Sequence, residues 1–396
     1  MDKIKAFCRD RDWEAVGELS FYAYFAINIL MKAFSYDHGD NIYKCFFYTA
    51  IIFWLIKLLT TRYTLREVFW IALLLSVGVM LSVVTRQNMW LLSIMTVIGM
   101  KNCRFWLLVQ LAVSIRTLSL IVLTVGAAAG IYDIGLQTTL DSEYVETKVY
   151  GFAMGEPNTA YLTVFLALVL LLYYYYDRLN IIWFVGTSAV ALFFYKFTLC
   201  RTGVLVFFFC WALILFEKWV KWRKAMAVLA LSVPVGGIFS LVMMLLYDGE
   251  NAVMSQINHL VSGRIYIMNT YFKDQGISLF PRTQEVFYTS YHGLIDNSYM
   301  FVFLYGGVLV ALFFFWIICL TLYRLYRNGF YKELVMTGTM ALYGVLEQFV
   351  LNGFMNIFLL LCGILLYPSL MSAIERPAGE GRGRHVRRKA ALGKNN

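Results

Sequence analysis

Long apolar runs, separated by short polar stretches, fill the chain from residue 17 to residue 372. A helix that crosses the hydrocarbon core of a bilayer needs about 20 mostly apolar residues. Twelve runs approach that length: 17–35, 43–59, 67–84, 88–100, 105–131, 158–176, 180–198, 203–216, 225–247, 297–322, 333–351 and 353–372. The pattern predicts an all-α, polytopic integral membrane protein with about twelve transmembrane helices, in which the short run 88–100 is either a span or a half-buried segment.

The polar stretches divide the chain without adding a soluble domain. We expect a cytoplasmic N-terminal tail (1–16), a single membrane domain (17–372) and a basic, disordered cytoplasmic tail (373–396). The longest polar stretch, 248–296, is predicted to be an extracytoplasmic loop. A chain that is 60% hydrophobic and only 15% charged has too much apolar surface for a soluble fold.

The long loop contains apolar residues at helical spacing, which predicts an amphipathic helix lying along the membrane interface. These residues are Val253, Ile257, Leu260, Met268 and Tyr271. Arg264 follows Ile257 by seven residues, or about two turns, and therefore falls on the same apolar face. We expect its guanidinium to point toward the membrane and meet a lipid phosphate, with simple snorkelling as the alternative.

The net charge of +10 is unevenly distributed along the chain. If the N-terminus is cytoplasmic, the inner segments hold 24 of the 34 Lys and Arg residues, which is the positive-inside pattern and places both termini in the cytoplasm. This distribution disfavours a nucleic-acid partner. The seven cysteines are scattered singly, and no phosphate-binding or dinucleotide-binding motif is present, so we expect neither a metal site nor a cofactor.

One charge lies deep within a predicted span. Arg116 stands in the middle of WLLVQLAVSIRTLSLIVLTVG, where a cation costs several kcal/mol, on the order of 3, unless it faces protein or water. Two interpretations remain open. Arg116 either contributes to substrate binding or is a structural residue paired with a carbonyl group or with Glu347.

Three outward segments carry most of the other candidate residues, and we expect them to converge in space. In GFAMGEPNTAYL, Glu156 and Asn158 either form a turn with Asn158 as the helix N-cap or hold a sugar hydroxyl. In LCRTGV, Arg201 lies in a turn between two apolar runs, and its planar guanidinium suits a diphosphate.

The third outward segment ends in HGLIDNSYMFVFLYGG. His292 stands near Asp296 and is either a general base or an ordinary surface residue. Asn297 either lines the site or caps the following helix. Glu347 and Asn352, near the outer end of a later span, either contact an acceptor or, for Glu347, neutralise an arginine.

The order and spacing of GEPN, RTG, SGR and HGLIDNSYMFVFLYGG resemble the O-antigen polymerase and ligase superfamily, especially the polymerases of capsular or exopolysaccharide repeat units of Gram-positive bacteria. The resemblance covers residues 85–370. It implies an undecaprenyl-diphosphate-linked oligosaccharide as donor and a second lipid-linked sugar as acceptor, at the outer face of the bacterial cytoplasmic membrane. Flippase and chain-length regulator proteins are candidate partners.

When the roles of the family's motifs are assigned to the matching residues, the resemblance implies that Arg201 and Arg264 hold the donor diphosphate. It also implies that His292, Asp296 and Asn297 form the rim of the active site. Cys200 departs from the pattern, since many relatives have a serine before the arginine. A lipid diphosphate is already a good leaving group, so such a transfer needs cations and a base rather than a metal.

Three other functions remain as alternatives. A ligase that attaches finished glycans to another acceptor has the same arginine requirement. A flippase or transporter of lipid-linked sugars would place its charged residues near the bilayer midplane, where only Arg116 is predicted to lie. A structural scaffold would not require arginines at headgroup depth.

Overall fold

The computed structural model describes residues 13–36, 41–140, 146–220, 224–283 and 295–374. Helices dominate these residues, and one short β-hairpin interrupts them. In chain order the elements are α2 (Trp13–Ala33), α3 (Asn41–Thr60), α4 (Leu65–Thr85), α5 (Met89–Ile98), α6 (Phe105–Ala128), β1 (Leu136–Leu140), β2 (Glu146–Tyr150), α7 (Pro157–Tyr174), η1 (Tyr176–Arg178), α8 (Ile181–Thr198), α9 (Arg201–Leu215), η2 (Phe216–Val220), α10 (Met226–Ala230), α11 (Ser232–Leu246), α12 (Ala252–Leu260), α13 (Arg264–Gln275), α15 (Ser298–Phe301), η3 (Val302–Gly306), α16 (Gly307–Arg327), α17 (Tyr331–Tyr343), η4 (Ile357–Cys362), α18 (Gly363–Leu366) and α19 (Leu370–Ile374).

Seven helices of the described residues are long and apolar enough to cross a membrane. They are Asn41–Thr60, Leu65–Thr85, Phe105–Ala128, Pro157–Tyr174, Ile181–Thr198, Arg201–Val220 and Ser298–Arg327. Their outward faces carry large apolar side chains such as Leu59 (83% exposed) and Leu65 (91% exposed). Such surfaces suit lipid rather than water. The chain is therefore a helical membrane protein, as predicted.

Four predicted runs do not form a single long helix in the structure. Run 88–100 contains only the ten-residue α5, and run 225–247 is divided between α10 and α11. Run 333–351 is helical only as far as Tyr343, and run 353–372 consists of η4, α18 and α19. The break between α10 and α11 has a local cause, because Pro234 lacks a backbone N–H and is tolerated only in the first turn of a helix.

The segment 344–356, between α17 and η4, has an irregular backbone that is largely buried. Irregular backbone at membrane depth requires polar partners inside the protein. Two buried side-chain hydroxyls supply several of these polar partners. Ser298 Oγ bonds Glu347 O (2.6 Å), Phe349 N (3.0 Å) and Val350 N (3.1 Å), and Ser93 Oγ bonds Leu351 O (2.6 Å) and Gly353 N (3.2 Å). The segment is thus a defined structure, referred to below as the buried segment.

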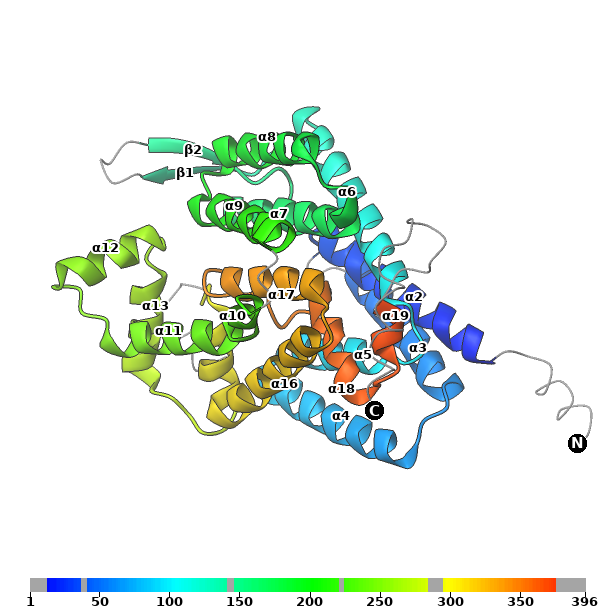
Figure 1. The fold of residues 1–396 in the computed structure, drawn as a ribbon. Coiled ribbons are helices and arrows are strands. Elements are labelled where there is room, and N and C mark those ends of the chain that lie inside the picture. The colour runs from blue at the N-terminus through cyan, green and yellow to red at the C-terminus, as the bar shows by residue number, and fades with distance from the viewer. Residues whose placement is uncertain (1–12, 37–40, 141–145, 221–223, 284–294, 375–396) are drawn as a thin grey trace, which may run out of the picture.

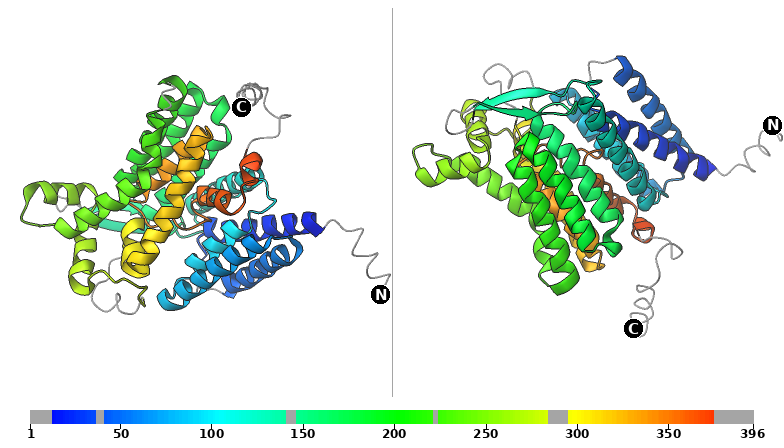
Figure 2. Two further views of the ribbon diagram at one scale, coloured as in Figure 1. Left: turned by 60° about the horizontal axis from the view of Figure 1, so that its bottom comes forward. Right: turned by 90° about the horizontal axis from the view of Figure 1, so that it is seen from above.

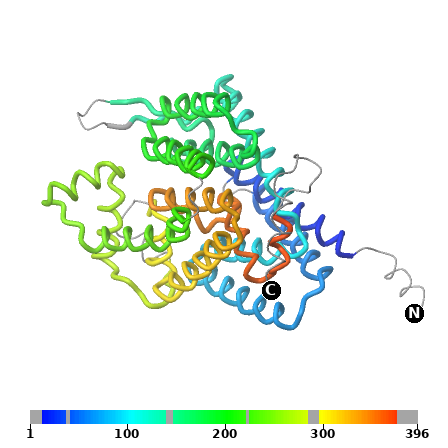
Figure 3. The backbone as a smooth tube through the Cα atoms, viewed as in Figure 1, coloured from blue at the N-terminus to red at the C-terminus, as the bar shows by residue number. Residues whose placement is uncertain are grey.

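The helix α17 occupies the centre of the molecule and packs against α7, α9, α10, α11 and α16 (Figure 1). The β-hairpin and α12 project from the same side of the helical body in Figure 1 and in the right-hand view of Figure 2. Figure 3 shows the blue and cyan N-terminal helices beside the red C-terminal part of the chain, in agreement with the contacts of α5 with η4 and α18.

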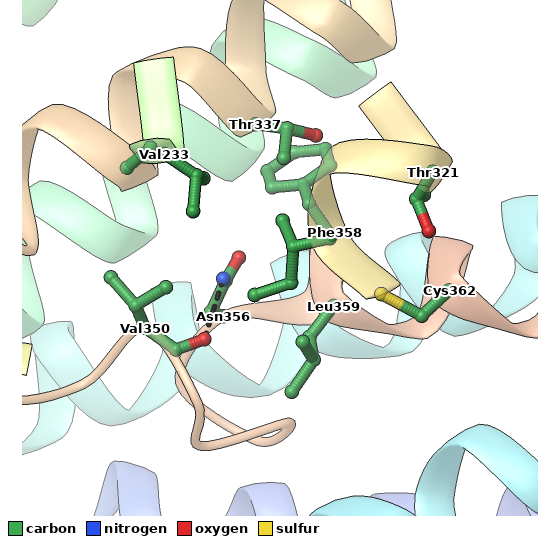
Figure 4. A pocket seen from close by; sticks show the side chains of 10 residues that line it. Val233, Thr321, Thr337, Val350, Asn356, Phe358, Leu359 and Cys362 are labelled. Carbon is green, nitrogen blue, oxygen red and sulfur yellow. Dashed lines mark hydrogen bonds between the residues drawn. The ribbon is translucent and has the colours of Figure 1, made fainter. Parts of the chain in front are cut away.

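An internal cavity of about 10 Å³ is lined by residues of the buried segment and of α11, α16, α17 and η4. Figure 4 shows the Asn356 side chain at this cavity, with its amide nitrogen donating to Val350 O at 2.8 Å. Asn356 Oδ1 is buried and has no hydrogen-bond partner among the described residues. The cavity is large enough for one water molecule and far too small for a sugar ring.

Candidate functional site

A buried ion pair joins the start of α13 to the buried segment. Arg264 Nη2 lies 2.6 Å from Glu347 Oε1 and 3.8 Å from Asp296 Oδ2. Arg264 is only 5% exposed, and Glu347 is also buried. Glu347 therefore neutralises an arginine, which is one of its two interpretations. Its contact with an acceptor stays a prediction.

Arg264 does not point toward the membrane as predicted. The expected amphipathic helix is divided into α12 and α13, because Ser262 (φ 57°) and Gly263 (φ 79°) both adopt the left-handed conformation. Helical periodicity cannot be extrapolated across such a break, and Gly263 is the residue type that adopts this conformation without strain. Arg264 begins a new helix that packs on α11, and its side chain enters the protein.

The beginning of α15 fixes the position of Asp296. Asn297 is the N-cap of this helix, and its side-chain oxygen accepts from Tyr299 N and Met300 N at 2.9 Å each. Its amide nitrogen donates to Ser240 Oγ (2.9 Å) and Val345 O (2.7 Å). Asn297 therefore ties α15 to α11 and to the buried segment. Asn297 was predicted either to line the site or to cap the following helix, and the structure shows the cap.

Asp296 lies outside the predicted spans, and its side chain is 37% exposed. Burial raises the pKa of its carboxyl group above the ordinary value, Arg264 opposes this shift, and Glu156 reinforces it. Glu156 also acts electrostatically on Glu347. Glu156, from the loop before α7, is thus a neighbour of the Arg264 group, although some 140 residues separate it from Asp296 in the sequence.

The N-terminus of α7 differs from the prediction that Asn158 is the N-cap. Glu156 is the N-cap, Pro157 follows at the first helical position, and Asn158 lies inside the first turn. Proline is favoured at this position because its fixed φ suits the helix. A backbone N–H at this position would have no acceptor within the helix, so its absence from proline costs nothing. The Glu156 side chain makes no capping hydrogen bond.

The turn before α9 brings Arg201 to the same end of the helical body. Cys200 is the buried N-cap of α9, and Arg201 is the first, exposed residue of the helix. The Cys200 thiol interacts electrostatically with Glu347 and Arg264. No ion pair of Arg201 is found within the described part of the chain.

Gly203, in the first turn of α9, is closely packed against two tyrosines. A Cβ atom at Gly203 would lie 2.2 Å from Tyr161 Cδ1 and 2.8 Å from the Tyr343 hydroxyl oxygen. Glycine is required because any side chain would collide with these rings. The RTG motif thus combines an exposed arginine with a close helix contact.

Arg116 lies apart from these contacts. It is 2% exposed, and its Nη2 donates to Phe354 O in the buried segment at 2.6 Å. Its partner is therefore a carbonyl group and not Glu347. Asn352 belongs to the same segment and accepts from Phe354 N at 3.0 Å. Both residues support the backbone that carries Glu347.

Together these contacts define one site with an exposed rim and a buried floor, which we call the rim-and-floor site. The rim comprises Glu156, Arg201 and Asp296, and the floor comprises Arg264, Glu347, Tyr161 and Tyr343. His292 lies outside the described residues. Among the described residues, no group of three or more His, Cys, Asp or Glu side chains is placed to hold a metal ion.

No protein-family model, curated protein or solved structure matches this chain. The predicted convergence of the three outward segments is observed for Glu156, the Cys200–Arg201 turn, Arg264 and Asp296. Sequence reasoning missed Tyr161 and Tyr343, because a tyrosine in an apolar run is ordinarily a core or belt residue.

Proposed function

We propose that this protein is a membrane glycosyltransferase that polymerises undecaprenyl-diphosphate-linked oligosaccharide repeat units at the outer face of a bacterial cytoplasmic membrane. The observation that carries the proposal is the rim-and-floor site, in which arginines, carboxylates and tyrosines from five distant parts of the chain meet at one end of the helices. The motif resemblance described above supplies the substrate class.

The proposal includes a topology. In it, both termini lie in the cytoplasm and each of the twelve predicted apolar runs crosses or enters the membrane. The β-hairpin, α12 and α13 then belong to the extracytoplasmic side. The exposed apolar residues Val253 and Leu260 on α12 support contact of that helix with the membrane interface.

The proposed reaction is a direct displacement at the anomeric carbon of the donor sugar. An acceptor hydroxyl forms the new C–O bond, the bond to the lipid diphosphate breaks, and the acceptor proton passes to Asp296. Arg201, on the rim and without a described ion-pair partner, neutralises charge that develops on the departing diphosphate. Arg264, already bonded to Glu347, shapes the site. Displacement of this kind predicts inversion at the anomeric carbon.

The decisive experiment is turnover by the purified full-length protein in proteoliposomes. The lipid-linked oligosaccharide of the producing cells is supplied from outside, without nucleotide sugar. We expect a ladder of glycan lengths from molecules with their long loop facing outward. Movement of unmodified lipid-linked oligosaccharide between leaflets, without a ladder, would replace the proposal with a flippase function. Transfer of a single finished glycan to another acceptor would indicate a ligase.

The pH dependence of turnover provides a second prediction. If ionised Asp296 accepts the proton, activity rises with pH through a pKa above that of an ordinary aspartate, because burial raises this pKa. Glu156 also raises it, so Glu156→Gln should shift the rising limb of kcat/KM to lower pH. Asp296→Asn should remove the limb together with most activity. A profile that is identical in wild type and Glu156→Gln would exclude Asp296 as the titrating base.

A further inference from the structure

The turn between α3 and α4 carries two exposed arginines. Arg62 lies in the turn itself, and Arg66 is the second residue of α4. Neither side chain makes a hydrogen bond or an ion pair with another residue that the structure describes. An exposed arginine is ordinarily a solvated charge, so the surroundings of this turn decide whether the pair can bind a ligand.

The acidic group beside these arginines is already engaged. Glu67 Oε2 accepts from Lys101 Nζ at 2.5 Å and from Thr64 N at 2.7 Å. Lys57 Nζ donates to Lys101 O at 2.6 Å, which fixes the loop after α5 against the turn. The turn and this loop together bring four basic side chains beside one carboxylate, so the group has a net positive charge. Its two lysines are largely buried, and the two arginines face outward.

Each arginine stands at the end of an exposed apolar face. Residues three, four and seven positions apart lie on the same face of a helix. The exposed residues that follow Arg66 on its own face of α4 are Phe69, Trp70 and Leu73. Arg62 follows the exposed face of α3 formed by Ile52, Leu55 and Leu59. Because such faces suit acyl chains, the two arginines are expected at the depth of the lipid headgroups.

The combination of charge and apolar surface selects the ligand. Free phosphate or an acidic peptide would be attracted by the arginines but would leave the apolar faces uncovered. A phospholipid with a net negative charge satisfies both requirements. Its phosphate accepts charge-assisted hydrogen bonds from guanidinium groups, and its acyl chains cover the apolar side chains. Clusters of basic residues beside transmembrane helices attract anionic lipids for this reason.

We propose that Arg62 and Arg66 bind the phosphate of an anionic phospholipid whose acyl chains lie along the exposed faces of α3 and α4. Lys57 and Lys101 add positive potential from behind the arginines without touching the lipid. In the proposed topology the turn is cytoplasmic, so the lipid belongs to the inner leaflet. The site does not involve the rim-and-floor site, and it is independent of the proposed glycan transfer.

Native mass spectrometry of the full-length protein in a nonionic detergent tests this inference. The probes are phosphatidylglycerol and phosphatidylcholine with identical acyl chains, and glycerol 1-phosphate as a competitor without chains. Wild type is compared with the double variant Arg62→Gln, Arg66→Gln. The matched control is the double variant Arg178→Gln, Lys224→Gln. Both control residues are exposed and belong to other inner segments of the proposed topology.

We expect wild type to bind phosphatidylglycerol more tightly than phosphatidylcholine. The Arg62→Gln, Arg66→Gln variant should bind phosphatidylglycerol about 25-fold more weakly, or roughly fivefold for each arginine near an anionic headgroup. Its binding of phosphatidylcholine should be unchanged, and the control variant should behave like wild type. Thermal unfolding of the delipidated protein should be the same in all three proteins, because the replaced side chains are exposed and have no described ion-pair partner.

Three results would overturn the inference. If the Arg62→Gln, Arg66→Gln variant binds phosphatidylglycerol like wild type, or wild type does not prefer this lipid, the arginines are solvated charges. Equal losses in both double variants would indicate a general effect of charge at this face of the protein. Displacement of phosphatidylglycerol by an equal concentration of glycerol 1-phosphate would show an anion site to which the apolar faces contribute nothing.

Discussion

Glu347→Leu should lower the free energy of unfolding by roughly 3–5 kcal/mol, the usual cost of leaving one partner of a buried ion pair uncompensated. Arg264 is 5% exposed and lies 2.6 Å from Glu347, whereas Asp296 is more distant at 3.8 Å. Asp296 therefore compensates only in part. Reversible unfolding in mixed detergent micelles measures the effect.

The double variant Arg264→Met, Glu347→Leu is the matched control for this prediction. Removing both charges eliminates the uncompensated group, and apolar replacements of similar volume are often neutral or stabilising. We expect the double variant to recover most of the stability lost in Glu347→Leu. If its stability equals the sum of the two single losses, the two side chains do not interact, and the ion pair has no energetic role.

Arg201→Gln should reduce kcat/KM for chain extension by roughly 10²–10³-fold, which is the usual effect of removing one donor to a developing oxyanion. Arg201→Lys should fall between this variant and wild type, because lysine keeps the charge but loses the planar, bidentate geometry. Stability should be unaffected, since Arg201 is exposed and has no ion pair among the described residues.

Arg178→Lys serves as the control for the Arg201 variants. Arg178 is also exposed, but it lies in η1, which follows the C-terminal end of α7, opposite the end that carries Glu156. We expect wild-type turnover from this variant. Equal losses in Arg178→Lys and Arg201→Lys would indicate a general effect of surface charge on lipid-linked substrate, and Arg201 would have no specific role in the reaction.

The sequence predicted which segments meet at the site, but not all of the hydrogen bonds and ion pairs between their side chains. Asn297 is the N-cap that its position before an apolar run indicated. Arg116 is paired with a carbonyl group, one of the two structural partners considered. The placement of Arg264 was wrong, because two left-handed residues, Ser262 and Gly263, end one helix and begin another. The prediction that Asn158 is the N-cap was also wrong, because Pro157 occupies the first helical position and Glu156 is the N-cap.

The buried segment marks the limit of sequence reasoning. Residues 344–356 read as apolar and helical, yet the chain there is irregular and depends on hydroxyls from α5 and α15 and on the Arg116 guanidinium. Local propensity cannot anticipate partners that lie 49 to 258 residues away in the sequence. Tyr161 and Tyr343 were missed for the same reason, because their contacts with Gly203 form only in the folded chain.

The sequence by itself determined that this chain is a helical membrane protein, because the length and composition of an apolar run are local properties that lipid selects directly. Only the tertiary structure decided that Arg264 is paired with Glu347, that Arg201 lacks an ion-pair partner among the described residues, and that two tyrosines form a floor beneath them. These features depend on distances between residues from different helices, which packing sets and no local pattern encodes.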